Sequence, residues 1–191
     1  MKKNELLLIC SLCLTLGLSA QTPETITIST KKFLNTLTKE EIQKIRYEFD
    51  DTLRLKWTNL PVGLVPRTGV QYGALADSNK IAFHHVLTTI LSSQGYLKVT
   101  SIMQLDDILN SLYQNAFDRG EIDQELLTRI QNLNWSYDNF FISIWGDLKN
   151  GSNWGLKFGG HHISINVTVT KNSVSISPFF LGTDPAEIKS G

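Results

Sequence analysis

The stretch that decides the fold covers residues 159–170 and reads Gly159-Gly160-His161-His162-Ile163-Ser164-Ile165-Asn166-Val167-Thr168-Val169-Thr170. Polar and apolar residues alternate along it, which is typical of a β-strand with two different faces. The apolar face holds His161, Ile163, Ile165, Val167 and Val169, and the polar face holds His162, Ser164, Asn166, Thr168 and Thr170. Solvated sheet faces usually carry Lys and Glu, so this uncharged face favours a ligand surface or the floor of a pocket.

A second strand over residues 173–177 completes a predicted hairpin at 161–177, with Lys171 and Asn172 as its loop. A two-residue loop opposes only polar residues on one face: Thr170 with Ser173, Thr168 with Ser175, and Asn166 with Ser177. On the other face it opposes only apolar ones: Val169 with Val174, and Val167 with Ile176. This agreement between the two faces supports the register.

Further strands are predicted over residues 139–145, which are apolar on both faces, and over 154–158. The chain before them has helical patterns. Thr38 and Glu41 form a capping box, a helix over 74–93 is ended by Gly95, and Thr100 and Asp123 begin two more, so the helices come first. Helices followed by strands indicate an α+β fold, with a helical N-terminal half and then an antiparallel sheet.

The first 20 residues have the order of a secretory signal peptide. Lys2 and Lys3 precede an apolar run over 6–18, and Ser19-Ala20 offers a cleavage point. The alternative is a retained membrane anchor, although the run is short for a bilayer. We expect an exported protein, periplasmic or secreted, without stable membrane insertion after cleavage.

The rest of the chain is predicted to hold a loose lead over 21–28 and a single α+β domain over 29–191. Both cysteines, Cys10 and Cys13, lie in the signal segment, so the mature chain has no disulfide. Removing Lys2, Lys3 and Glu5 from 18 basic and 18 acidic residues leaves 16 and 17. This balance argues against a nucleic-acid partner.

The polar face supplies the candidate catalytic residues His162, Ser164 and Asn166. His162 is suited to act as a general base on water or on a substrate hydroxyl. Direct catalysis by Ser164 with His162 is disfavoured, because residues two apart on a strand lie about 6.6 Å apart while a nucleophile and its base need about 3 Å. The alternative is a hydrogen-bonded scaffold that fixes the neighbouring turn.

Three other residues are candidates for ligand contact. Arg67, in a turn, can enter a cleft and hold a carboxylate or a sugar, or else pair with Glu48, Asp50 or Asp51. Trp154 lies at the end of a Gly-Ser-Asn loop, where an indole can be exposed to a ligand. His161 is a ligand-binding candidate, or a core histidine bonded to backbone.

No metal site is predicted. Adjacent strand residues point to opposite faces, so His161 and His162 cannot easily bind one ion. His84 and His85 lie about 100° apart on a helix with no strong ligand nearby, and a surface position is favoured for them. The sequence leaves the cofactor unknown.

Several short segments together resemble domain-of-unknown-function family 3500, whose members are mostly bacterial and often exported. They are Leu91-Ser92-Ser93-Gln94-Gly95-Tyr96, Trp154-Gly155 with Phe158, Gly160-His161-His162-Ile163-Ser164-Ile165-Asn166, Pro178-Phe179-Phe180-Leu181-Gly182 and Asp184-Pro185-Ala186. The resemblance implies a relation in fold and no particular chemistry. Because members usually continue into further helices, it also implies that this chain is a C-terminally truncated member.

Two functional hypotheses follow. In the first, the protein is an exported enzyme acting on a small molecule or glycan around His162, Ser164, Asn166 and Arg67. In the second, the same face belongs to a non-catalytic exported binding module for a glycan or an apolar small molecule. A third possibility is a purely structural fragment.

Overall fold

A computed structural model describes residues 22–149 and 151–187, so the expected signal segment over 1–20 lies outside the described residues. The α-helices are α2 (Pro23–Leu34), α3 (Lys39–Ile45), α4 (Asp77–Ile90), α5 (Ser93–Asp118) and α6 (Gln124–Gln131). Short 3₁₀ turns form η2 (Thr52–Leu55) and η3 (Tyr72–Ala74). The strands are β1 (Arg46–Tyr47), β2 (Val70–Gln71), β3 (Phe141–Gly146), β4 (Trp154–Gly160), β5 (Ile163–Val169) and β6 (Val174–Leu181).

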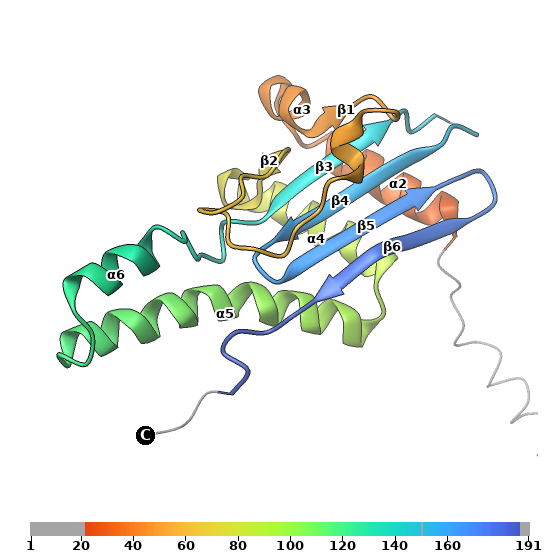
Figure 1. The fold of residues 1–191 in the computed structure, drawn as a ribbon. Coiled ribbons are helices and arrows are strands. Elements are labelled where there is room, and N and C mark those ends of the chain that lie inside the picture. Colours follow the sequence, from red (N-terminus) through yellow and green to blue (C-terminus); the bar gives the residue numbers. More distant parts are fainter. Residues whose placement is uncertain (1–21, 150, 188–191) are drawn as a thin grey trace, which may run out of the picture.

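The strands form one sheet in the order β1-β3-β4-β5-β6, with β2 also paired to β3 (Figure 1). All neighbours are antiparallel except β1 and β3, which are parallel. The predicted α+β class is confirmed, with most of the helices ahead of a mostly antiparallel sheet. The two-residue strands β1 and β2 come from the helical half and were not predicted.

Each face of the sheet has a different cover (Figure 1). Helices α2 and α4 lie against one face, where apolar residues of the strands meet them in the main core. Residues 48–69, which we call the covering loop, cross the opposite face. Helix α5 runs along the β6 side of the sheet and extends past it, and α6 folds back along that extension. The two helices form an arm.

Three predictions about the helical half are wrong. The lead over 21–28 is not loose from Pro23 onward, because Thr22 caps α2 and Ile26 is fully buried in the core. Gly95 does not end a helix either. The Ser92 hydroxyl accepts the Gly95 N–H and starts α5, so Thr100 lies inside that helix and not at its cap. The caps at Thr38 and Asp123 are confirmed.

The hairpin is partly as predicted. Val169 opposes Val174 and Thr168 opposes Ser175, as expected. A register shift then replaces the expected pair of Asn166 with Ser177, and the Asn166 amide Nδ2 instead donates to the carbonyl of Pro178 at 2.8 Å. Proline lacks the N–H that a regular ladder would use, which accounts for an irregularity here.

The strand predicted from His161 begins at Ile163. His161 and His162 form the two-residue turn between β4 and β5, and His162 has a φ of 56°. The left-handed region is tolerated by His better than by most residues, which lets this pair close a tight hairpin. The predicted alternation is confirmed only after the turn, from Ile163 to Val169.

Gly160, just before this turn, has no room for a side chain. A Cβ atom there would lie 2.6 Å from Cδ1 of Phe140 and 2.8 Å from the carbonyl of Asn139. We therefore expect Gly160→Ala to lower the free energy of unfolding by about 1–3 kcal/mol, measured by urea denaturation.

The matched control is Gly95→Ala. The nearest atom to a Cβ there is the Ser92 Oγ at 3.4 Å, and the site is helical. This change should be neutral or stabilising by up to about 1 kcal/mol. Equal stabilities for the two variants would contradict the close approach at Gly160.

Candidate functional site

The face of the sheet under the covering loop is polar and hollow. Ser143 of β3, Lys157 of β4 and Asn166 of β5 stand side by side in one row across it. Gly155 and Gly159 flank Lys157 on β4 and present no side chain. The result is a lysine that stands between two gaps in the surface of the sheet.

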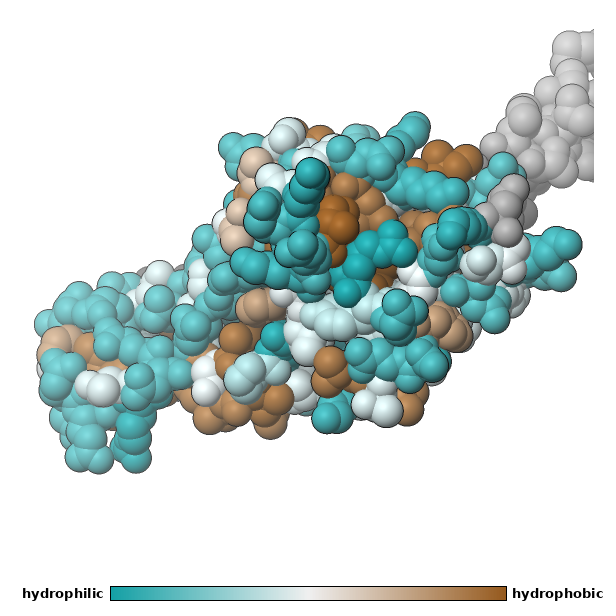
Figure 2. All heavy atoms as spheres, turned by 90° about the horizontal axis from the view of Figure 1, so that it is seen from above, coloured by the Kyte–Doolittle hydropathy of each residue, from teal (hydrophilic) through white to brown (hydrophobic). Residues whose placement is uncertain are grey.

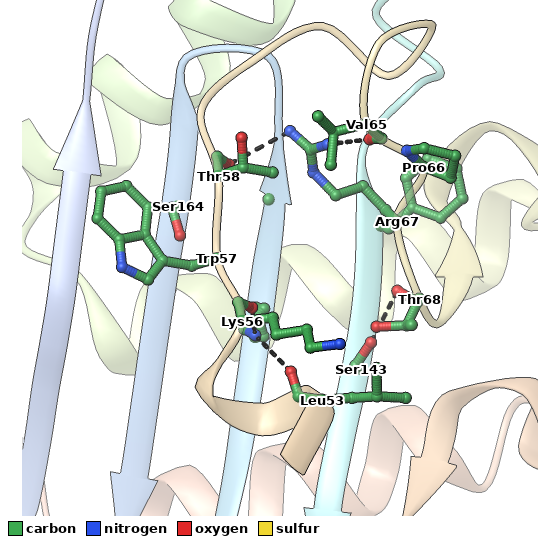
Figure 3. A pocket seen from close by; sticks show the side chains of 13 residues that line it. Leu53, Lys56, Trp57, Thr58, Val65, Pro66, Arg67, Thr68, Ser143 and Ser164 are labelled. Carbon is green, nitrogen blue, oxygen red and sulfur yellow. Dashed lines mark hydrogen bonds between the residues drawn. The ribbon is translucent and has the colours of Figure 1, made fainter.

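These gaps form a groove with two hollows, both lined by Lys157 and Trp57. The first, with a cavity volume of about 190 Å³, lies over Gly159 and is shown in Figure 3. The second, of about 180 Å³, lies over Gly155. Figure 3 shows the covering loop arching over the first hollow, with Arg67 on one side and the Trp57 indole on the other.

Lys157 fastens the covering loop to the sheet. Its ammonium donates to the carbonyls of Leu53 at 3.3 Å and Arg54 at 3.2 Å, and also to that of Lys56. It lies 4.9 Å from the centre of the Trp145 ring, a cation–π contact. Burial, with a smaller effect of the neighbouring Arg54 and Arg67 charges, lowers the pKa of Lys157 to about 8.

Arg67, near the other end of the covering loop, holds parts of the loop to one another and joins it to the end of β4. Its guanidinium donates to the carbonyl of Val65, and through Nη2 to those of Thr58 at 3.2 Å, Leu60 at 2.5 Å and Gly160 at 3.1 Å. Burial lowers its pKa. Arg67 thus lines the groove, and among the described residues no ion pair joins it to Glu48, Asp50 or Asp51.

The predicted residues Ser164 and Asn166 also line this groove, one in each hollow. The Asn166 amide Nδ2 donates to Ser164 Oγ at 3.0 Å, and its buried Oδ1 has no partner in the described part of the chain. Ser164 is almost fully buried, and it lines the first hollow. Ser164 and Arg67 therefore line the same hollow, and Asn166 lines the neighbouring one.

His162 does not join them. It lines neither hollow and lies at the hairpin turn, with its ring stacked on that of His161 at 3.8 Å between centroids. Its backbone N–H donates to the Asn59 carbonyl at 3.0 Å, and its own carbonyl accepts the Gly182 N–H at 2.9 Å. Burial lowers the pKa of His162, and the His161 charge adds to this effect.

His161 is buried, but its partner is a carboxylate and not the expected backbone. Its Nδ1 lies 2.7 Å from Oδ1 of Asp106 on α5, and both side chains are shielded from solvent. The ring also stacks on Trp135, with 5.8 Å between centroids. His161 thus joins the hairpin to α5, and no face of it is open to a ligand.

The expected exposure of Trp154 is wrong. The residue is 1% exposed, and its indole Nε1 donates to the Thr27 hydroxyl of α2 at 3.1 Å. The reason is that α2 includes residues expected to be loose and covers this end of β4. The surface position favoured for the histidine pair holds for His85 only. His84 is half-buried, with its ring nitrogens 2.8 Å from the Tyr72 and Tyr96 hydroxyls.

Sequence reasoning missed Lys157 and Trp57, which both hollows share. A signal for Lys157 was present, because it is the one charged residue of β4 and stands two positions from a glycine on either side. In a half-buried strand, a lysine with a glycine on either side on the same face stands beside empty space, because the glycines have no side chains to fill it. Trp57 carried no such signal, since an aromatic residue in an irregular segment predicts neither a pocket nor a core.

Two general features bear on the class of site. Within residues 22–149 and 151–187, no three His, Cys, Asp or Glu side chains come together in a group able to hold a metal ion. None of the helices described in these ranges is both long and apolar enough to cross a bilayer.

Comparison with known protein families gives a match over most of the chain. The model of the family described as Protein of unknown function (DUF3500) matches residues 19–191. The chain belongs to this family. Membership confirms the resemblance noted in the sequence, and the activity of the family is unknown. No curated protein and no solved structure matches the chain.

The buried pair of His161 and Asp106 should be essential for the hairpin turn. Asp106→Ala would leave a buried imidazole without its partner, and we expect it to lower the free energy of unfolding by about 3 kcal/mol. Asp118→Ala, an exposed change on the same helix, should stay within about 0.5 kcal/mol of the wild type. Urea denaturation of both variants decides this, and a loss at Asp106 no larger than that at Asp118 would refute it.

Proposed function

We propose that the protein is an exported binding module whose groove takes a small organic carboxylate with an apolar body. One observation carries the proposal. Arg67 and Lys157 both line the groove, yet neither forms an ion pair with a carboxylate in the described part of the chain. Partly buried positive charges without a counter-charge favour an anion. Export is inferred from the signal-like order of residues 1–20.

The lining of the first hollow supports an apolar body on that anion. Side chains of Leu53, Val65, Pro66 and Phe141 form much of its wall, and Trp57 closes one side. Hydroxyls of Thr58, Thr68 and Ser164 are placed among them. A volume of about 190 Å³ is below that of pockets for drug-sized ligands, so the ligand is compact. The two cations are the reason to prefer an anion to the neutral glycan considered from sequence.

Binding is better supported than catalysis. A nucleophilic Ser164 needs a base in hydrogen-bond contact, and its described partner is the Asn166 amide, which is a donor. His162, the base considered from sequence, lines neither hollow. The Lys157 ammonium donates to loop carbonyls and has no described hydrogen bond to Ser143 or Ser164. The groove thus has recognition groups without an assembled proton-transfer pair.

Benzoate, with benzamide as its uncharged counterpart, tests the proposal by isothermal titration calorimetry. We expect benzoate to bind at least about tenfold more tightly than benzamide, equivalent to ~1.4 kcal/mol. Lys157→Met should remove most of this preference, while Lys171→Met, which changes an exposed lysine in the β5–β6 loop, should keep it. Thermal melts of both variants establish that they are folded.

The pH dependence gives a second readout of the same binding. Benzoate stays ionised between pH 7 and 9, whereas Lys157, with a pKa of about 8, loses its charge over this range. Affinity for benzoate should therefore fall as the pH rises in the wild type, and should be flat in Lys157→Met. Equal binding of benzoate and benzamide, or no binding of either, would refute the proposal.

A further inference from the structure

A third hollow, of different chemistry, lies on the arm, away from the covering loop. Its cavity volume is about 380 Å³, within the range of small-molecule sites. Helix α5 contributes Asn110, Gln114 and Asn115 to it, the end of α6 contributes Gln131, and the segment after α6 contributes Asn134. The arm is coloured hydrophilic over most of the surface seen in Figure 2.

The residues that line this arm cleft are uncharged, and most carry an amide. Asn110 and Gln114 lie four residues apart on α5, so their amides share one face of the helix. Each amide has a donor NH₂ beside an acceptor oxygen. Two neighbouring hydroxyls of a ligand can bind both, one by accepting from the NH₂ and the other by donating to the oxygen. The side chains of Asn110, Asn115 and Gln131 have no hydrogen bond to other described residues, so their donors and acceptors are available.

Trp135 supplies an independent observation. It lines the cleft and is 9% exposed, and its buried indole Nε1 has no acceptor among the described residues. A buried donor without an acceptor is costly, and an indole N–H usually finds a partner. The ring is already in contact with His161 and Tyr113, so the cleft offers hydrogen bonds more than an open stacking face.

We propose that the arm cleft is a binding site for a neutral saccharide. An anion would find no cation in the lining, and a cation would find no carboxylate. An apolar ligand would have to displace water from the amides without replacing its hydrogen bonds. A neutral ligand with many hydroxyls needs no charged partner, and it can replace the hydrogen bonds that water makes with the amides. One of its hydroxyls can also accept from the Trp135 N–H. This site is separate from the groove and does not depend on the function proposed there.

Nuclear magnetic resonance of the ¹⁵N-labelled protein tests this with maltose, cellobiose, lactose and N,N′-diacetylchitobiose as probes. The Trp135 indole signal, identified by its loss in Trp135→Phe, should shift on titration with at least one of them. Asn115→Ala and Gln131→Ala should each weaken that binding at least fivefold. Both residues are exposed, so neither change should disturb folding.

Gln104→Ala is the matched control, because Gln104 is an exposed amide on the same helix outside the cleft. It should bind the saccharide as the wild type does. The proposal is overturned if none of the four probes shifts the Trp135 signal at millimolar concentrations. It is also overturned if Asn115→Ala and Gln131→Ala bind the saccharide no more weakly than Gln104→Ala.

Discussion

The buried contact between His161 and Asp106 joins the β4–β5 turn to α5, and the position of the covering loop depends on that turn. Burial away from water raises the pKa of Asp106, and the hydrogen bond from His161 acts in the opposite direction because it stabilises the carboxylate. The pair fixes the β4–β5 turn against α5. From that turn, the Gly160 carbonyl accepts from Arg67, and the His162 N–H donates to Asn59, so the turn also holds the covering loop.

The covering loop is held in place mainly by polar contacts, and this gives the groove its character. Several of its large apolar side chains remain exposed, including Leu55 at 74% and Leu64 at 58%. Its attachment to the sheet comes instead from loop carbonyl oxygens that accept from Lys157 of β4, and from Arg67 of the loop, which donates to the carbonyl of Gly160 at the end of β4. Carbonyl groups satisfy the donors of these cations but do not neutralise their charge. The hydrogen bonds hold the walls of the groove in place, and the two positive charges have no carboxylate beside them in the described residues. This is the basis of the carboxylate proposal.

Local pattern was enough to predict much of the sheet, and contacts between distant segments explain what it missed. The pairing of Val169 with Val174 was predictable, because only one register keeps both faces consistent. The turn at His161 and His162 was not, because alternation continues through it and its position depends on Asp106, 55 residues earlier. Trp154 was misjudged for the same reason, since Thr27 of α2 covers it. The face that joins Ser164 to Asn166 was visible in sequence, whereas the approach of Arg67 and Lys157 depended on the path of the covering loop.

The most direct test of the account is to locate a bound carboxylate by crystallography. Crystals of the protein grown with 4-bromobenzoate would place the bromine by its anomalous signal. The account predicts a peak inside the hollow over Gly159, with the carboxylate directed toward Arg67 and Lys157. A bromine bound elsewhere, or an empty groove in crystals that hold the ligand at another surface, would contradict it.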